Sequence, residues 1–331
     1  MAGTSNSFPY DEELFNYYWG EATDPVRDAL LASGAVVNDS TIGAMIQNGS
    51  NKYTMPYYDL LGGEEDNYDG KTDITATEAT GNALSGVVFG RAHAFKAKSF
   101  INDFNSGAKP LQYAATKVGN WYNHKRQKRM LGILGGVAQV TDFKSHVIDT
   151  GAGIDAGTLG DAAVDALGDN AESLTLAFMH SKVANALAKK ELLEFAKYTD
   201  ENGIERQIRN LAYINGMTVV VDDSAPMTPA VTSGTAKPAT YTTYLLGSGF
   251  IRYAKANVEK PSEPSRDPKT NGGEDYIYTR IRETIHPYGF SFKEPSGMGE
   301  SPTDAQLFAK ANWELKYDPK VVPFVAVTTQ V

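Results

Sequence analysis

The stretch PLQYAATKVGNWYNHKRQKRMLGILGG, residues 110–136, predicts one long helix. Pro110 suits the first helical position, where a backbone N–H is not needed. Apolar residues then recur at helical spacing on both sides of the basic run HKRQKR, residues 124–129. Gly135 and Gly136 are expected to end the helix. A helix of about 25 residues spans roughly 37 Å, which exceeds the usual globular length and predicts a spine for the fold.

A long excursion precedes this helix. In KYTMPY, residues 52–57, large apolar side chains alternate with other residues at the period of a strand, and Pro56 restricts that strand to an edge. The stretch LLGGEEDNYDGKTD, residues 60–73, is rich in glycine and acid, and an alternating pattern resumes at Val87. A structureless loop of this length is improbable in a compact domain. Residues 52–98 are therefore predicted to form a projecting hairpin.

The first 35 residues are unusually aromatic and allow two interpretations. They predict either a terminal helix packed on its own core or an apolar arm laid on a neighbouring subunit. Asp24 and Pro25 predict a helix start, and Gly34 predicts its end.

The rest of the chain mixes strands and helices, which predicts an α+β fold. Short apolar runs predict buried strands at residues 174–179, 217–221 and 243–251. Ser181 is a suitable N-cap for a helix after the first of them. Stretches rich in Pro, Ser and Thr predict surface loops at residues 224–240 and 260–273, the second also a domain boundary. Further strands are predicted from Tyr276, at 313–317 and at 321–327, with a helix entered at Ser301, Pro302 and Asp304.

Composition excludes several kinds of site. The 331 residues include no cysteine, which excludes disulfides, thiolate metal sites and a cysteine nucleophile. The formal net charge of −9 argues against a protein that grips nucleic acid over its whole surface. The first residues show no secretory signal, and no apolar run approaches the roughly 18 residues of a membrane span.

The sequence shows no convincing reaction centre. The five histidines form no pair at zinc-binding spacing. His180 and Ser181, with Asp222 and Asp223 after a strand, are the only candidates for a hydrolytic triad, but Ser181 lacks a G-x-S-x-G elbow. The turn at residues 179–182 has no glycine to cradle a phosphate. No catalytic, cofactor-binding or metal-binding residue is therefore expected.

The basic run has three interpretations: a solvated face, a short nucleic-acid patch or a subunit interface. An acidic counterpart exists at the tip of the predicted excursion. Opposite charges placed across a subunit boundary fix register more than they add affinity. The candidate intersubunit residues are Glu64, Glu65, Asp66 and Asp69 on the acidic side and Lys125, Arg126, Lys128 and Arg129 on the basic side.

The order of these segments resembles the major capsid proteins of tailed bacteriophages, which have the Hong Kong 97 fold. The resemblance extends over nearly the whole chain and is carried by the order of its segments, together with phrases such as HPYGF (286–290), SPTDAQL (301–307) and NWE (312–314). It implies an N-terminal arm (1–50), an extended loop (51–100), a peripheral domain with the spine helix (101–145 and 274–331) and an axial domain (146–273).

The resemblance implies a shell subunit that self-assembles into pentamers and hexamers of an icosahedral head. The shell would enclose double-stranded DNA without reading its sequence. A separate scaffolding protein, a portal and possible decoration proteins are the expected partners, with assembly in the host cytoplasm and residence in the virion. Two alternatives stay open: an encapsulin-like nanocompartment shell with a protein cargo, and a small intracellular hydrolase.

Overall fold

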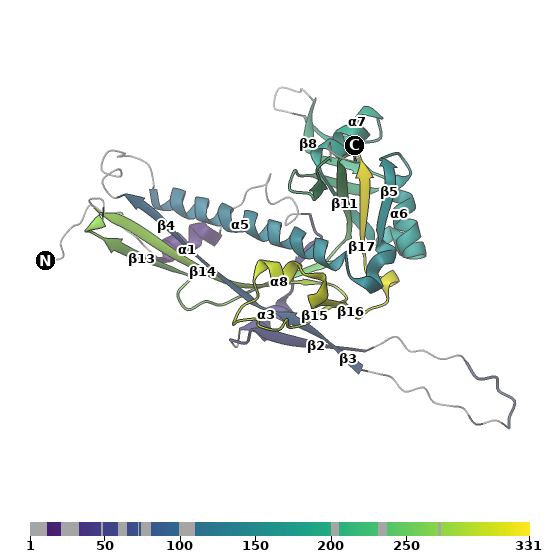
Figure 1. Cartoon of the computed structure of the whole chain (residues 1–331), viewed down its shortest axis with the longest axis horizontal. Helices are drawn as coiled ribbons and strands as arrows, with labels where there is room; N and C mark the ends of the chain where they lie inside the picture. Colours follow the sequence, from purple (N-terminus) through teal and green to yellow (C-terminus); the bar gives the residue numbers. More distant parts are fainter. Residues whose placement is uncertain are drawn as a thin grey trace.

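The structure is a computed structural model that describes residues 12–20, 33–47, 49–58, 65–71, 73, 81–98, 110–199, 205–230, 237–270 and 273–331. The spine helix α5 (Pro110–Val137) runs along a long sheet and ends beside a second sheet, and a hairpin projects away from both (Figure 1). Its 28 residues confirm the predicted spine. The mixture of helices and strands confirms the α+β class.

The long sheet is organised around one strand, β14 (Glu274–Pro287). Along one edge β14 pairs with β4 (Phe89–Lys98). Along the other edge its first part pairs with β13 (Ser262–Asp267) and its last part with β12 (Ile251–Ala256). Strand β1 (Val36–Asn38) pairs in parallel with β12. The prediction of a surface loop at residues 260–273 is wrong for β13. Pro264 is tolerated there because β13 is an edge strand.

The second sheet has eight strands, seven of them in the order β5-β17-β11-β6-β9-β8-β7, with β10 beside β11. Their bounds are β5 Val147–Gly153, β6 Leu174–Met179, β7 Glu194–Thr199, β8 Glu205–Ile214, β9 Met217–Val221, β10 Met227–Thr228, β11 Thr240–Gly247 and β17 Phe324–Gln330. Strands buried on both faces read as continuous apolar runs. The predicted strands at 174–179 and 217–221 are confirmed.

Helices cover one face of this sheet, and the spine covers part of the other. Helices α6 (Thr158–Leu167) and α7 (Ser181–Lys189) pack with the side chains of alternate strand positions such as Ala177 and Val325. The intervening positions, such as Phe178 and Phe324, pack with the end of α5. The N-cap of α7 is His180, whose Nδ1 accepts from the Lys182 N–H at 3.1 Å, so the prediction of Ser181 as the cap is wrong.

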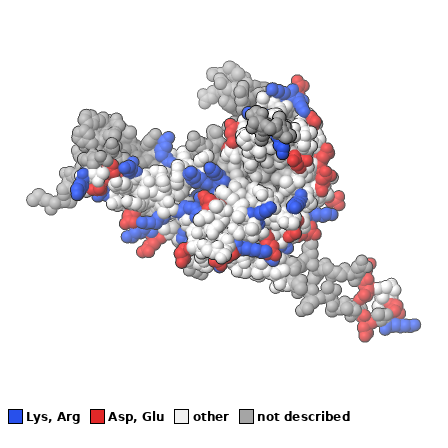
Figure 2. Space-filling view, viewed as in Figure 1, with Lys and Arg blue, Asp and Glu red and all other residues white. Residues whose placement is uncertain are grey.

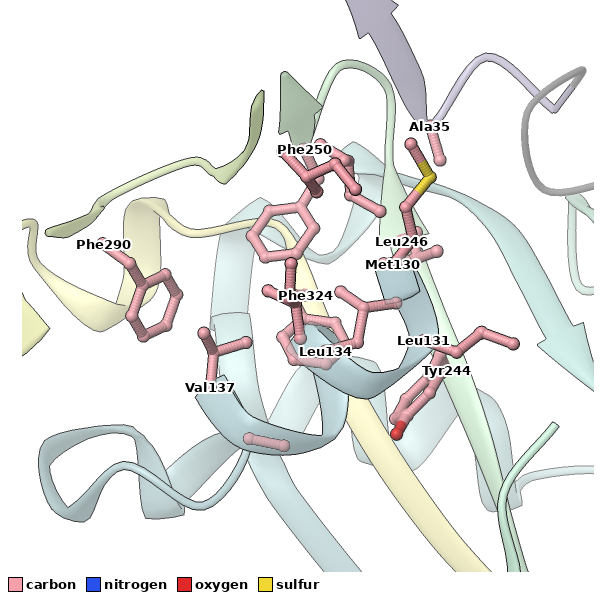
Figure 3. Packing of buried hydrophobic residues seen from close by; sticks show 14 of the residues in the cluster. Ala35, Met130, Leu131, Leu134, Val137, Tyr244, Leu246, Phe250, Phe290 and Phe324 are labelled. Carbon is pink, nitrogen blue, oxygen red and sulfur yellow. The ribbon is translucent and has the colours of Figure 1, made fainter. Parts of the chain in front are cut away.

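One apolar run serves both sheets. The predicted strand at residues 243–251 is divided: β11 ends at Gly247, and β12 begins at Ile251 in the other sheet. Gly249 adopts a φ of +70° in the turn between them, a conformation that glycine reaches without strain. Phe250 in this turn is fully buried and stacks on Phe324, with ring centroids 5.0 Å apart (Figure 3).

The end of α5 is held by close contact with α8 (Asp304–Phe308). A Cβ on Gly132 would lie 2.4 Å from the Phe308 ring, and one on Gly136 would lie 2.5 Å from the Phe308 carbonyl oxygen. The helix continues to Val137, so the prediction that Gly135 and Gly136 end it is wrong by one or two residues. Gly132 and Gly136 instead allow Phe308 to approach the helix.

Helix α8 begins at Asp304, within the predicted entry, but Ser301 and Pro302 precede it and it is short. Thr303 caps it, and Thr303 and Gln306 form a capping box in which each side chain accepts from the other's backbone N–H. The chain then forms β16 (Trp313–Leu315), which pairs with β15 (Phe290–Phe292). Short 3₁₀ segments lie at residues 141–146, 168–173, 310–312 and 319–321.

The described part of the arm packs on its own chain. In α1 (Glu12–Gly20), Phe15 is fully buried, and Trp19 lies 5.3 Å from Tyr122 of α5 between ring centroids. This favours the first interpretation of the arm for α1. The predicted helix start at Asp24 and Pro25 lies outside the described residues. Helix α3 (Ser40–Ile46), capped by Asp39, was not predicted.

The two strands that form the stem of the predicted hairpin are confirmed. Strand β2 (Lys52–Tyr58) pairs antiparallel with β3 (Gly81–Val87). The predicted hairpin extended too far, because residues 89–98 form β4 and belong to the long sheet.

Candidate intersubunit surfaces

The root of the hairpin is fixed to the body. The Tyr53 hydroxyl and the Thr284 Oγ1 are 2.9 Å apart in a buried hydrogen bond between β2 and β14. The backbone N–H of Ser85 donates to the Ser291 Oγ at 3.0 Å. The Tyr53 ring also fills the space over Gly86, where a Cβ would lie 2.1 Å from the ring. The hairpin therefore leaves the body in a defined direction.

The far end of the hairpin is exposed and acidic. Residues 65–71 lie well beyond the ends of β2 and β3, and acidic side chains gather there (Figures 1 and 2). Gly70 adopts a φ of +71°, and the Asp69 carboxylate accepts from the Lys71 N–H at 2.7 Å, which shapes a tight turn. Tyr68 is 89% exposed. Glu64 lies outside the described residues, whereas Glu65, Asp66 and Asp69 are at this tip.

The basic run divides into two faces of α5. Lys125 and Lys128 are exposed, as is His124. Arg126 and Arg129 are buried, because they share a face with the apolar residues one turn further along the helix. Lys125 lies over the Trp121 ring, with 5.4 Å from Nζ to the ring centroid.

The buried arginines meet a carboxylate of the same chain. Glu283 is fully buried; its two oxygens accept from Arg126 Nε at 2.8 Å and from Arg129 Nη1 at 3.4 Å. The Tyr253 hydroxyl donates to Glu283 at 2.9 Å. Burial and the Glu283 charge together raise the pKa of Tyr253 well above its usual value.

A second carboxylate extends this network to α8. Asp304 accepts from Arg129 Nε at 2.7 Å and from Arg91 Nη2 at 2.6 Å. Burial alone would raise the pKa of Asp304, but the hydrogen bonds from Arg129 and Arg91 lower it overall. Arg126 and Arg129 thus tie the spine to its own chain, which corrects the expectation that they face a neighbour. Their spacing from Met130 and Ile133 is the sequence signal that separates them from Lys125 and Lys128.

The hydrolytic constellation does not assemble. Ser181 Oγ lies 3.5 Å from His180 Nδ1, and the Asp223 carboxylate lies 3.6 Å from the same nitrogen. A triad needs the serine and the carboxylate on opposite ring nitrogens, and here Nδ1 already caps α7. Asp222 instead accepts from Gln127 of the spine at 2.8 Å. The two aspartates therefore face different partners.

Within the described ranges, no group of three or more metal-binding side chains is close enough to hold an ion. No helix in those ranges is long and apolar enough to cross a membrane.

Comparison with known proteins identifies relatives along the whole chain. A model of the Gp13-like family, described as major capsid protein 13-like, matches residues 66–322. The major capsid protein of Bacillus phage SPP1 is 30% identical over 330 residues, which is 98% of both chains.

Solved structures with a similar fold include phage capsids. A capsid chain of cyanophage Pam1 has a TM-score of 0.55 at 11% identity, over 100% of this chain and 99% of that one. The capsid of Ralstonia phage GP4 has a TM-score of 0.54 at 9% identity, over 91% and 88% of the two chains. At these identities the likeness is one of fold.

Proposed function

Because this chain belongs to the Gp13-like family of phage major capsid proteins, we propose that its projecting hairpin makes the contacts that join its copies into a head shell. The protein is a structural component of a tailed-phage virion and not an enzyme. It self-assembles into the capsid. The observation that carries the proposal is the hairpin: its root is bonded to β14, whereas its outer strand positions and tip are exposed.

The two sheets give the proposed units of the subunit. We assign the axial role to the eight-stranded sheet with α6 and α7, mostly residues 146–273, and the peripheral role to the spine with the long sheet. Two segments cross the proposed boundary: β12 and β13 lie in the long sheet, and β17 lies in the eight-stranded one. Contacts of the axial unit would close the subunits into pentamers and hexamers, since head-to-tail contacts form rings when the rotation closes.

The acidic tip has an accessible basic counterpart on the spine. Lys125 and Lys128 are exposed on α5, and Figure 1 shows the tip far from this helix in the same chain. Pairing between the tip of one copy and the spine of another would bring these opposite charges together. Such rim charges mainly set register and rate of association.

The shell is proposed to enclose double-stranded DNA without sequence-specific contacts. The net charge of −9 supports this, because an acidic wall repels phosphate and lets DNA pack against it without adhesion. A separate scaffolding protein, a portal and decoration proteins are proposed partners, and the host cytoplasm is the proposed place of assembly.

Electron microscopy and sedimentation of the purified full chain test the assembly model. We expect closed shells or ring-shaped capsomers, with nuclease-resistant DNA in particles recovered from infected cells. Particles that hold only a protein cargo would favour the nanocompartment alternative. A protein that stays monomeric at all concentrations would contradict the proposal.

A further inference from the structure

A surface hollow lies where β1, the turn before β12 and the segment before β17 meet. Its volume is about 390 Å³, and Val37, Gly249, Val321 and Pro323 line it, with Phe250 beneath. Val37 and Val321 are 44% and 45% exposed, although valine is usually buried. Phe250 is fully buried and belongs to the main core (Figure 3). The hollow therefore has apolar walls over a buried aromatic base.

One end of the hollow is polar. Arg252 Nη1 lies 3.3 Å from the Asp39 carboxylate, and its guanidinium stacks over the Tyr288 ring at 5.1 Å. Asp39 is itself fixed, because it caps α3 through the Thr41 and Ile42 N–H groups. Apolar walls with a hydrogen-bonding end suit a side chain that has an apolar body and a polar tip, which is the description of tyrosine.

The hairpin of the same chain displays such a side chain. Tyr58, the last residue of β2, is 82% exposed. Its ring lies across Gly81 on the paired strand, 3.6 Å from where a Cβ would be, so the ring has a support that limits its rotation. An exposed and partly ordered tyrosine loses little conformational freedom on binding, and tyrosine is enriched among residues that dominate interface energies.

The two surfaces are complementary, because one carries an exposed tyrosine and the other is a hollow with apolar walls and a polar end. A donor patch and a different acceptor patch on each copy produce head-to-tail contacts, which repeat around a ring. We propose that Tyr58 of one copy inserts into the hollow between Val37 and Val321 of a second copy, with its hydroxyl directed toward the Arg252–Asp39 pair. This inference rests on the proposed role of the hairpin and adds a specific binding site for its stem.

Chemical crosslinking of the assembled protein tests this contact. The chain has no cysteine, so a variant with Tyr58→Cys and Val321→Cys carries only the two intended thiols. With a short bis-maleimide reagent, assembled particles should give a ladder of covalent multimers beyond dimers. Each single variant should give dimers at most, because one thiol per copy cannot form a chain. The pair Tyr68→Cys with Val321→Cys is the matched control, and it should give no ladder.

The outcomes separate this inference from the proposed function. If particles form but the Tyr58→Cys, Val321→Cys variant gives no ladder, the proposed contact between Tyr58 and the hollow is wrong, whereas the proposed self-assembly is not affected. A ladder from the Tyr68 pair alone would place the tip in the hollow instead of the stem.

If the double variant does not assemble, the Tyr58→Ala variant tests the proposed contact instead. Its unfolding curve should match that of the parent chain, because the side chain is exposed. Its threshold concentration for assembly should rise at least about tenfold, as for truncation of an interface anchor. An unchanged threshold would overturn the inference.

Discussion

At Glu283, hydrogen bonds from two elements converge on a carboxylate that is closed to water. Arg126 and Arg129 of the spine and Tyr253 of β12 all bond to it. A buried carboxylate with partners of this kind is costly to replace, because the remaining charges keep their desolvation penalty.

We therefore expect Glu283→Gln to lower the free energy of unfolding of the monomer by about 3–5 kcal/mol, as for other broken buried pairs. Urea denaturation followed by circular dichroism measures this. Glu263→Gln is the matched control, because the Glu263–Arg280 bridge is half exposed and should change stability by at most about 1 kcal/mol. Equal effects of the two substitutions would show that Glu283 does not hold the spine.

The burial of His286 predicts that the protein loses stability in acid. Its ring is fully buried between Tyr53 of the hairpin root and Trp313 of β16, opposite Arg252 on β12 with Asp39 nearby. Burial lowers its pKa from 6.5 to about 4, and Arg252 adds to this. The unfolded chain therefore binds a proton between pH 6.5 and 4, whereas the folded chain does not.

The contribution of His286 to stability should be constant above pH 7 and fall as the pH decreases, by about 3 kcal/mol at pH 4. His146, whose pKa burial also lowers, adds to the same slope. His286→Gln should flatten the dependence measured by urea denaturation between pH 4 and 7, whereas the substitution of exposed His93 by Gln should leave it unchanged. An unaltered slope in the His286 variant would refute the assignment.

At the scale of elements, two adjacent glycines of the spine have different roles. A Cβ at Gly136 would lie 2.5 Å from backbone of α8, whereas one at Gly135 would meet only the Tyr244 hydroxyl at 3.4 Å. We expect Gly136→Ala to destabilise the monomer by about 1–3 kcal/mol through overpacking. Gly135→Ala should stabilise it by about 0.5–1 kcal/mol through helix propensity. Thermal unfolding of both variants measures the difference, and a stabilised Gly136 variant would contradict the packing described here.

Elements whose signal is local could be predicted from the sequence. Helical spacing gave the spine, and alternation gave the hairpin stems. The failures lie where distant residues decide: Gly132 and Gly136 of the spine are explained by Phe308, and β13 forms because β14 offers it a free edge. For the candidate site, the sequence located the basic run. Only the packing of α5 against β14 shows that Arg126 and Arg129 are paired with Glu283 of the same chain.

At the scale of the whole molecule, the accessible charges on tip and spine predict a charge-reversal phenotype. Lys125→Glu with Lys128→Glu should raise the threshold concentration for assembly about tenfold, since two lost pairs replaced by repulsion amount to about 1–2 kcal/mol. Restoring assembly by reversing Glu64, Glu65 and Asp66 to Lys would identify the partner. Sedimentation velocity measures both.

The control for this experiment is Lys144→Glu with Lys310→Glu, which changes the net charge equally at exposed sites elsewhere. If control and test variants assemble alike, charge pairing between tip and spine does not contribute. The reversal leaves Arg126 and Arg129 intact, so a folded monomer is expected throughout.

Strand β17 lies between β5 and β11, in the interior of the eight-stranded sheet, although it follows the other described strands in sequence. Synthesis must therefore proceed past residue 330 before that sheet can close. A polypeptide that lacked β17 would leave β5 without its partner and one edge of β11 open, and exposed strand edges favour aggregation. Correct folding of the subunit therefore depends on the strand of this sheet that is synthesised last.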